Sequence, residues 1–421
     1  MKSSVDLQAL LEHTEILYTC PERIWSLQEN APRLFEEVVR QNIIAEDLYS
    51  LLSRHVPTQR QVQHGIFGHF VRPDRHSRAI YLNLDATTID AKYSGCIAIK
   101  GAEPCAANFG ETLEQLVEKS SVWELETGVL PGVSSSVNVI MDRLHLFLVG
   151  EGKLPGVVEL EECKEDALQA LEFQEKHLKA FGEIGHVPLP LFVFRWPDET
   201  VEKVKAILRP LVSPTALRHL RRLDHGIGVY VYYYPSVPYR MAHLELPVVF
   251  GNISYDDRKQ ALLEQIPDPD NLISSWFEVV SRMLALGYTA TDPCSWNSGN
   301  CLMPQNLVLD GGICDINSLR QVSTITNEGH RRHSLFETVR WLDASVRFFL
   351  FGENALSSRF IRNSLHTYTI TLQNLQKRLM RFRAEGIEIN VHVERILFDD
   401  SSLTQQFENH LKGLSTKGKS F

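Results

Sequence analysis

The sequence lacks the features that would place the chain in a membrane or outside the cell. No apolar run approaches the ~18 residues that a membrane-spanning helix needs, and Met1 to Asp6 lack the apolar core of a signal peptide. The seven cysteines are scattered and include no Cys-x-x-Cys pair, so neither a zinc site nor a dithiol redox motif is indicated. We therefore expect a cytoplasmic protein with no membrane partner.

Excess positive charge is also missing. The formal net charge is -9, which argues against the broad positive field of a general nucleic-acid binder. The chain has no Gly-x-Ser-x-Gly nucleophile elbow, and its 16 histidines show no His-Glu-x-x-His spacing. Nucleic-acid binding, serine hydrolysis and zinc-dependent proteolysis are therefore not predicted.

The composition that remains is that of an ordinary globular protein. The 421 residues are 43% hydrophobic and 23% charged, without an internal repeat or a low-complexity tract. A chain of this length can bury about three quarters of its unfolded surface, so it needs no disulfide or metal in order to fold. We expect two or three domain-sized units.

The spacing of apolar residues predicts helices toward both ends of the chain. Amphipathic patterns span residues 5–53 and 163–181, and then 271–286, 334–351 and 365–385. The second half is therefore expected to be largely helical.

Short extended runs fall mainly in the first half. Residues rich in β-branched and aromatic side chains predict strands at 78–82, 96–100, 191–194 and 229–234, with one isolated strand at 387–391. Strands followed by helices indicate an α+β fold in which a sheet-containing lobe precedes a helical lobe.

A lysine closes one of the predicted strands. Lys100 ends the apolar run 96–100, where a kinase-like fold uses a strand lysine to hold nucleotide phosphates. A glutamate from a following helix orients that lysine, and the helix at 163–181 offers Glu172 and Glu175. The alternative is a solvated strand end and ordinary exposed helix acids.

A second candidate region follows the predicted helix at 271–286. The polar run Trp296–Asn300 precedes the apolar run Leu307–Leu309, and Asp310-Gly311-Gly312 and Asp315 come next. A loop amide and a carboxylate near a short hairpin are oxygen ligands suited to Mg²⁺. The alternative is turn chemistry, because hairpin turns favour Asn, Ser, Gly and Asp.

The order of these motifs resembles selenoprotein O, a kinase-like family that binds ATP in an inverted orientation and transfers AMP to protein hydroxyls. Phe67-Gly68-His69-Phe70, Arg78-Ala79-Ile80 and Ile99-Lys100-Gly101-Ala102 are similar to the family's Phe-Gly-His-Phe, Arg-Ala-Ile and Leu-Lys-Gly-Ala. The match covers roughly residues 64–350 in short islands whose shared order carries the resemblance.

The resemblance implies ATP and Mg²⁺ as cofactors and gives roles to particular residues. It makes Arg240, in Tyr239-Arg240-Met241-Ala242, a phosphate-binding residue. The family's spacing back from Pro188 identifies Glu175 as the partner of Lys100. The implied nucleotide-binding set is Phe67, Gly68, His69, Arg78, Lys100 and Arg240.

The resemblance also implies the metal ligands. Asn297-Ser298-Gly299-Asn300 is similar to Asn-Thr-Asp-Asn, which makes Asn300 the metal-binding amide. Asp310-Gly311-Gly312 is similar to Asp-Tyr-Gly, which makes Asp310 the metal carboxylate. The implied catalytic set is Lys100, Glu175 and Asp310.

Some positions depart from the family pattern. Arg75-His76-Ser77 stands where the family has Gly-Asp-Gly, Gly299 replaces an acidic residue, and the second phosphate-binding arginine is missing. The catalytic-loop base of small-molecule kinases falls near Ser295, which is not a carboxylate. These changes favour a new substrate or a binding-only scaffold over the family's own protein acceptors.

We therefore expect a protein-kinase-like bilobal fold. An N-terminal helical extension (1–60) precedes an N-lobe with insertions (61–234) and a helical C-lobe that carries the metal-binding loop (235–421). The predicted function is nucleotidyl transfer to an unidentified protein, peptide or small molecule. An ATP-dependent phosphotransferase and an inactive pseudokinase-type scaffold are the alternatives.

Overall fold

A computed structural model describes most of the elements predicted from the sequence. The described residues are 21–54, 56, 79–83, 95–101, 158–208, 220–235, 241, 255–264, 268–290, 301–302, 306–351, 365–399 and 403–408. They form a mixed α+β structure, as predicted. In these ranges no helix combines the length and the apolar character needed to cross a membrane.

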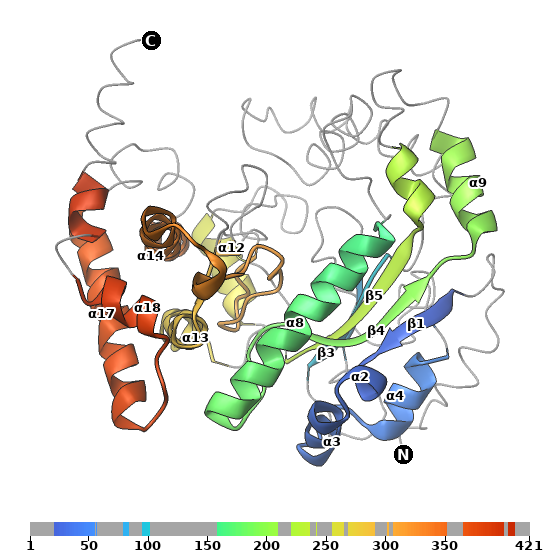
Figure 1. Ribbon diagram of the computed structural model, residues 1–421, viewed down its shortest axis with the longest axis horizontal. Helices are drawn as coiled ribbons and strands as arrows, with labels where there is room; N and C mark the ends of the chain where they lie inside the picture. Colours follow the sequence, from blue (N-terminus) through green and yellow to red (C-terminus); the bar gives the residue numbers. More distant parts are fainter. Residues whose placement is uncertain are drawn as a thin grey trace, which may run out of the picture. The chain divides into compact units, whose positions relative to one another are not determined.

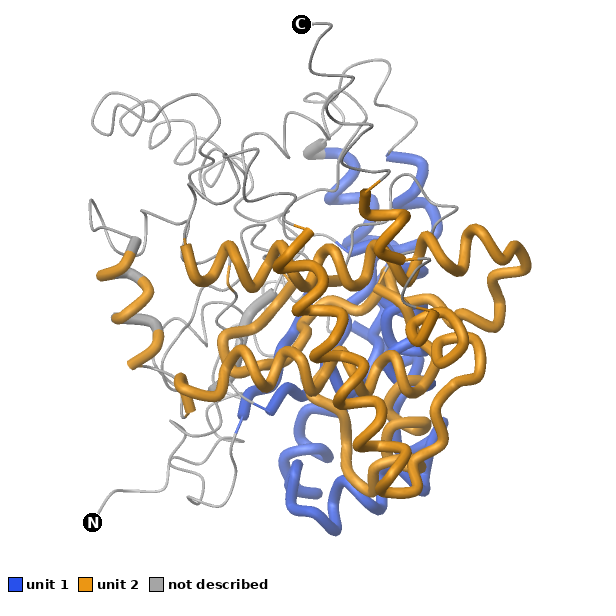
Figure 2. The backbone as a smooth tube through the Cα atoms, turned by 90° about the vertical axis from the view of Figure 1, so that its left-hand side faces the viewer, with its two compact units in different colours: residues 1–172, 188–238, 245–251 blue, residues 173–187, 239–244, 252–421 orange. Residues whose placement is uncertain are grey.

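The chain divides into two compact units that alternate along the sequence (Figure 2). Unit 1 comprises residues 1–172, 188–238 and 245–251, and unit 2 comprises 173–187, 239–244 and 252–421. The chain passes from unit 1 to unit 2 within one helix, α8 (Leu160–Phe181). The predicted lobes are consecutive segments, whereas these units are interleaved.

Unit 1 is built on a five-stranded antiparallel sheet (Figure 1). Its strands, in spatial order, are β1 (Glu22–Ser26), β4 (Leu189–Arg195), β5 (Gly228–Tyr234), β3 (Cys96–Lys100) and β2 (Ala79–Asn83). Four of the five correspond to the predicted strands of the first half. All seven residues of β5 are buried, which explains why this strand is an unbroken run of β-branched and aromatic residues.

Helices cover the sheet where small residues and aromatic rings permit close packing. A Cβ atom on Gly228 would lie 2.7 Å from the sulfur of Cys163, so the first turns of α8 pack directly on β5. The segment after β1 contains α2 (Leu27–Asn30), α3 (Pro32–Arg40) and α4 (Glu46–Leu52). Tyr49 of α4 packs on Phe192 of β4, with the ring centroids 4.4 Å apart.

Residues 22–26 were expected to be helical and instead form β1, so this part of the prediction for 5–53 is wrong. Strand β1 pairs with the edge of β4, with Ser26 opposite Phe192. Tertiary pairing with a strand about 170 residues away overrides the local helical pattern. Between β4 and β5 in the chain lie α9 (Asp198–Leu208) and the 3-10 helix η1 (Arg221–His225), joined by an ion pair between Lys205 and Asp224.

Unit 2 is mainly helical. Its described helices are α12 (Tyr255–Leu263), α13 (Leu272–Ala285), α14 (Glu328–Phe351), α17 (Leu365–Ala384), α18 (Val391–Leu397) and the 3-10 helix η3 (Val322–Thr324). A small ladder pairs β6 (Tyr288–Thr289) with β7 (Arg320–Gln321). Aromatic contacts hold the helices together: Trp276 of α13 meets Phe349 of α14 edge-on, and Phe336 of α14 packs on Tyr368 of α17.

The isolated strand predicted at 387–391 is wrong. Residues 387–390 have no regular structure, and α18 begins at Val391. The Asn390 side chain accepts hydrogen bonds from the backbone N–H groups of His392 and Val393, which caps the helix. An asparagine at this position therefore marks the start of a helix. The apolar residues that follow it, including the buried Val393, belong to α18.

Candidate functional site

Lys100 lies at the end of β3 and pairs with two acids of α8. Its Nζ atom is 2.7 Å from Oδ2 of Asp166 and 3.2 Å from Oε1 of Glu162. Only 17%, 12% and 10% of the Lys100, Glu162 and Asp166 side chains are exposed. The three charges are therefore shielded from water, which strengthens their interaction.

The backbone around Lys100 is fixed by a glycine. Gly101 has φ +83, and a Cβ atom there would lie 2.5 Å from the carbonyl oxygen of Gly228. The Trp196 indole N–H donates to the carbonyl oxygen of Gly101 over 3.1 Å. The position after the lysine thus needs a left-handed residue without a side chain, and the turn sets where Lys100 stands on the sheet.

Lys100 contacts Glu162 and Asp166, whereas the predicted partner was Glu175. Glu175 follows Asp166 by nine residues on α8, about two and a half helical turns further along. Glu162 and Asp166 are four residues apart and so share one face of the helix. The predicted helix started at residue 163, which left Glu162 out of consideration. The i,i+4 spacing of the two acids was the signal that could have found them.

The segment around Asp310 is a tight β-hairpin. Cys314 N donates to Asn306 O and Val308 N to Gly312 O, each over 2.9 Å, and Gly311 N donates back to Val308 O over 3.1 Å. Gly311 has φ +100, the left-handed conformation expected at the end of a three-residue hairpin loop. The Trp276 indole donates to Val308 O over 2.7 Å, so α13 supports this hairpin.

Asp310 lies at the tip of the hairpin, and protein groups occupy both of its oxygens. Oδ1 accepts the Gly312 N–H over 3.0 Å, and Oδ2 lies 2.8 Å from Nε2 of His186. Burial lowers the pKa of His186, but the charge and hydrogen bond of Asp310 outweigh burial and raise it above its ordinary value. With 6% of its side chain exposed, Asp310 acts as a link between the hairpin and the segment that carries His186.

Asp315 follows the second arm of the hairpin. Its Oδ1 accepts the Asn317 N–H over 3.4 Å. Burial raises the pKa of the Cys301 thiol, and the negative charge of Asp315 adds to that shift. The Cys301 N–H and the Ser318 hydroxyl both donate to Ala290 O. The Ala290 carbonyl oxygen therefore joins Cys301 to the segment that follows Asp315.

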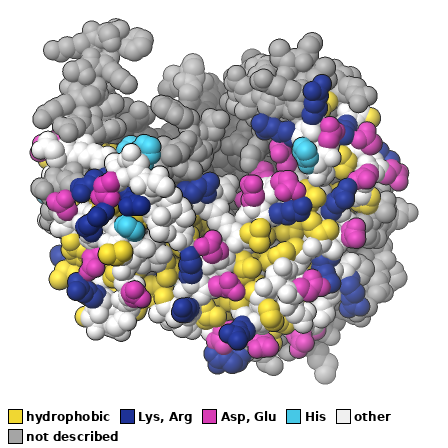
Figure 3. Space-filling model, viewed as in Figure 1, with side chains coloured by type: hydrophobic (Ala, Val, Ile, Leu, Met, Phe, Trp, Pro, Cys, Tyr) yellow, Lys and Arg dark blue, Asp and Glu magenta, His cyan; other side chains and the backbone are white. Residues whose placement is uncertain are grey.

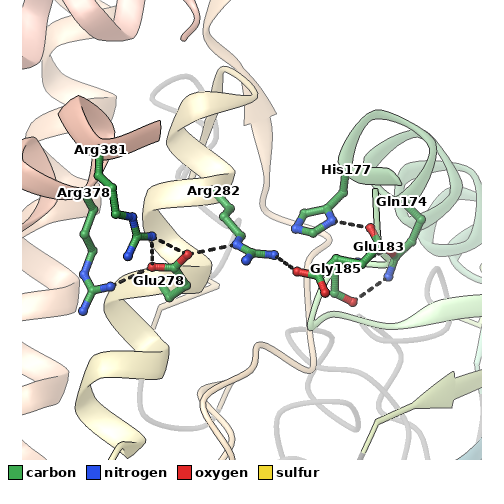
Figure 4. Close-up of polar contacts among 8 residues, drawn as sticks. All are labelled: Gln174, His177, Glu183, Gly185, Glu278, Arg282, Arg378 and Arg381. Atoms are coloured by element: carbon green, nitrogen blue, oxygen red, sulfur yellow. Dashed lines mark hydrogen bonds and ion pairs between the residues drawn. The ribbon is translucent and has the colours of Figure 1, made fainter. Parts of the chain in front are cut away.

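The segment carrying His186 is fastened to the second half of α8 (Figure 4). Gln174 donates to the carbonyl oxygens of Gly185 and Val187 and accepts the Gly185 N–H over 2.7 Å. His177 contacts Glu183 O through Nδ1 over 2.8 Å, and burial lowers the pKa of His177 to about 4. Arg282 of α13 in turn contacts the carboxylate of Glu183.

The other predicted site residues lie outside the described ranges: Phe67, Gly68, His69, Arg78, Arg240 and Asn300. Among the residues that are described, no three His, Cys, Asp or Glu side chains form a metal-binding cluster. On the face drawn in Figure 3, acidic and basic side chains are interspersed over the described surface. A search of family models, curated proteins and solved structures finds no match to this chain.

Proposed function

We propose that this protein is an ATP- and Mg²⁺-dependent nucleotidyltransferase of kinase-like fold that transfers AMP to a protein, a peptide or a small molecule. The observation that carries the proposal is the shielded contact of Lys100 with the acids of α8. Kinase-like enzymes use a strand lysine in this way, oriented by an acid from the next helix, to hold nucleotide phosphates.

The order of elements in unit 1 supports the same proposal. Among the described elements of unit 1, α8, β4 and β5 come after the lysine strand β3 in the chain, and β5 returns to pair with β3. This is the sequence of strand, helix and strands expected around a phosphate-binding lysine. On this proposal Asp166, at 2.7 Å, takes the orienting role that the resemblance to selenoprotein O implies for Glu175.

The hairpin of unit 2 supports a revised choice of metal carboxylate. Asp310 was predicted for this role, but its oxygens are engaged by Gly312 and His186 at the hairpin tip. Asp315 is the next carboxylate along the chain after the hairpin. We therefore assign the metal site to Asn300 and Asp315, whose oxygen atoms suit Mg²⁺, and a linking role to Asp310.

In the proposed reaction an acceptor hydroxyl oxygen bonds to the α-phosphorus of ATP. The bond from that phosphorus to the oxygen bridging to the β-phosphate breaks, pyrophosphate leaves with the electron pair, and the hydroxyl proton passes to a base. Lys100 and Arg240 would offset the negative charge that builds on the phosphate oxygens. Bound Mg²⁺ would supply further positive charge there. The choice of AMP over phosphate transfer follows from the resemblance to selenoprotein O.

The test is to incubate the purified protein with Mg²⁺, candidate acceptors and ATP labelled at either the α or the γ position. We expect α-label to enter an acceptor and pyrophosphate to be released, with both lost in Lys100→Ala. Asp315→Asn should reduce transfer by at least a hundredfold, whereas Asp310→Asn should retain measurable transfer at low temperature. Lys203→Ala, which alters an exposed lysine of α9, is the matched control.

Other outcomes have definite meanings. Transfer of γ-label with release of ADP would replace the proposal with an ATP-dependent phosphotransferase. MgATP binding that depends on Lys100, without transfer to any acceptor, would indicate a pseudokinase-type scaffold. Absence of ATP binding by calorimetry would overturn the nucleotide site altogether.

A further inference from the structure

The contact between α13 and α17 brings an arginine onto an exposed serine. Ser274 lies near the start of α13 and is exposed, and its hydroxyl oxygen accepts a hydrogen bond from Nη2 of Arg378 over 2.8 Å. Nη1 of the same arginine donates to Oε2 of Glu278 over 2.7 Å. Ser274 and Glu278 are four residues apart on α13 and share one face of the helix. One guanidinium of α17 therefore bridges a neutral hydroxyl and a carboxylate.

Glu278 has other arginine partners, as Figure 4 shows. Nη2 of Arg381 lies 2.7 Å from each of its oxygens, and Nε of Arg282 donates to Oε1 over 3.2 Å. Burial raises the pKa of Glu278, but the hydrogen bonds from Arg381 and Arg282 outweigh burial and lower the pKa below its ordinary value. Arg378 can therefore turn toward a stronger acceptor without leaving Glu278 unpaired.

The start of α13 also lacks negative charge. Its first turn lies within the described residues, and it contains no acidic residue and no side chain that caps the helix. The N-terminal end of a helix carries a partial positive charge, which a nearby anion stabilises. A negative group on Ser274 would therefore interact favourably with the helix end as well as with Arg378.

We propose that Ser274 is a phosphorylation site and that Arg378 binds the phosphate, which strengthens the contact between α13 and α17. The Ser274 oxygen bonds to the γ-phosphorus of ATP held by a protein serine kinase. The bond from that phosphorus to the oxygen bridging to the β-phosphate breaks, ADP leaves with the electron pair, and the hydroxyl proton passes to a base of the kinase. This inference does not rest on the nucleotide site proposed for unit 1.

The chemistry of both partners supports this assignment. A phosphoserine carries a charge of about -1.5 to -2 at neutral pH and offers three acceptor oxygens. Arginine binds phosphate through charge-assisted hydrogen bonds that are frequently bidentate. The exposed acids Asp268 and Asp270 precede the serine, so the kinase that fits this segment has a basic substrate groove.

The experiment uses the full chain with phosphoserine introduced at position 274 during synthesis. A ³¹P NMR titration should place the phosphate pKa clearly below its ordinary value of about 6, because Arg378 favours the dianion. Arg378→Gln should bring the pKa back toward 6, and Arg378→Lys, which keeps the charge but loses the planar fork, should lie between the two. The matched control is phosphoserine at position 323, since Ser323 is exposed in η3 and its described partner is the Gln321 side chain.

Thermal unfolding gives a second measurement on the same proteins and shows that each variant is folded. Phosphorylation of Ser274 should raise the midpoint by about 2–4 °C when Arg378 is present and should not raise it in Arg378→Gln. The inference is overturned if the phosphate pKa is the same with and without Arg378, or if phosphorylation lowers the midpoint in the wild-type background.

Access to the kinase is tested separately. The folded chain is incubated with ATP and a serine kinase that has a basic substrate groove, and peptide mapping locates the phosphate. We expect phosphate at Ser274. If a peptide spanning residues 268–280 is phosphorylated at Ser274 while the folded chain is not, Ser274 is not a modification site and the inference fails. Phosphate at Ser275 alone would overturn it as well.

Discussion

His177 shows how one buried side chain ties stability to pH. Its imidazole is 2% exposed, it stacks near Phe173 and Phe181, and its charged neighbours are Glu183 and Arg282. Burial lowers its pKa to about 4 in the folded protein, against 6.5 for the unfolded chain. Between these two values the unfolded chain binds the proton more readily than the folded protein does.

We therefore predict that His177 contributes a loss of stability as pH falls from about 6.5 to about 4. The full loss is about 3 kcal/mol, since one pKa unit corresponds to about 1.4 kcal/mol. Urea unfolding of wild type and His177→Phe across this range should show that the variant lacks this part of the slope. His366→Gln, at an exposed position of α17, should keep the wild-type slope. Parallel slopes for wild type and His177→Phe would contradict the prediction.

At the scale of elements, the hairpin at 306–314 depends on a glycine for two separate reasons. Gly311 has φ +100, and a Cβ atom there would lie 2.2 Å from Cβ of Ser275 on α13. Gly386 has a similar φ of +84 but nothing within 4 Å of the Cβ position. A substitution at Gly386 therefore tests backbone strain alone, whereas one at Gly311 tests backbone strain together with steric overlap.

We predict that Gly386→Ala lowers the free energy of unfolding by about 1–2 kcal/mol, the strain of a left-handed residue alone. Gly311→Ala should lower it by several kcal/mol, because the overlap with α13 adds to that strain. Adding Ser275→Gly to Gly311→Ala should recover part of the loss, and denaturant unfolding measures each step. Equal effects of the two single substitutions would contradict the close packing of the hairpin on α13.

The same elements show what the sequence could predict. Strong periodicity located α8, α13, α14 and α17, and β-branched runs located the strands of the sheet. Strand β1 was not predicted, because in the described sheet it pairs only with β4. That pairing joins distant parts of the chain and leaves no local pattern in the sequence. Asp310 is predicted as a metal ligand because an Asp-Gly-Gly run suits both a metal motif and a hairpin turn. The pairing of 306–308 with 312–314 shows the hairpin turn, which the run alone left open.

At the scale of the whole molecule, the interleaving of the two units has a practical consequence. Residues 173–187 belong to unit 2 although unit 1 segments flank them in the sequence. Within unit 2, Phe173 packs on Tyr288 and Phe181 packs edge-on against Phe382. A fragment that begins at residue 252 therefore lacks part of its own core.

We predict that residues 252–421 alone form a loosely packed state that binds hydrophobic dyes and unfolds without a sharp transition. A chimera that joins 173–187 through a flexible linker to residues 239–421 should regain a cooperative thermal transition. The control chimera carries the same segment with Phe173→Ser and Phe181→Ser. A cooperative transition in the 252–421 fragment itself would show that the added segment is dispensable.

The pairing of β1 with β4 also determines how early in synthesis β1 can join the sheet. Ser26 and Phe192 face each other in the ladder although 166 residues separate them in the chain. At the usual 5–20 residues per second, β1 leaves the ribosome about 8–33 s before its partner strand exists. During that interval its Trp25 side chain and unpaired backbone are open to other contacts. The ladder between β1 and β4 can therefore form only after the chain has been made through β4, and β1 is without this partner strand until then.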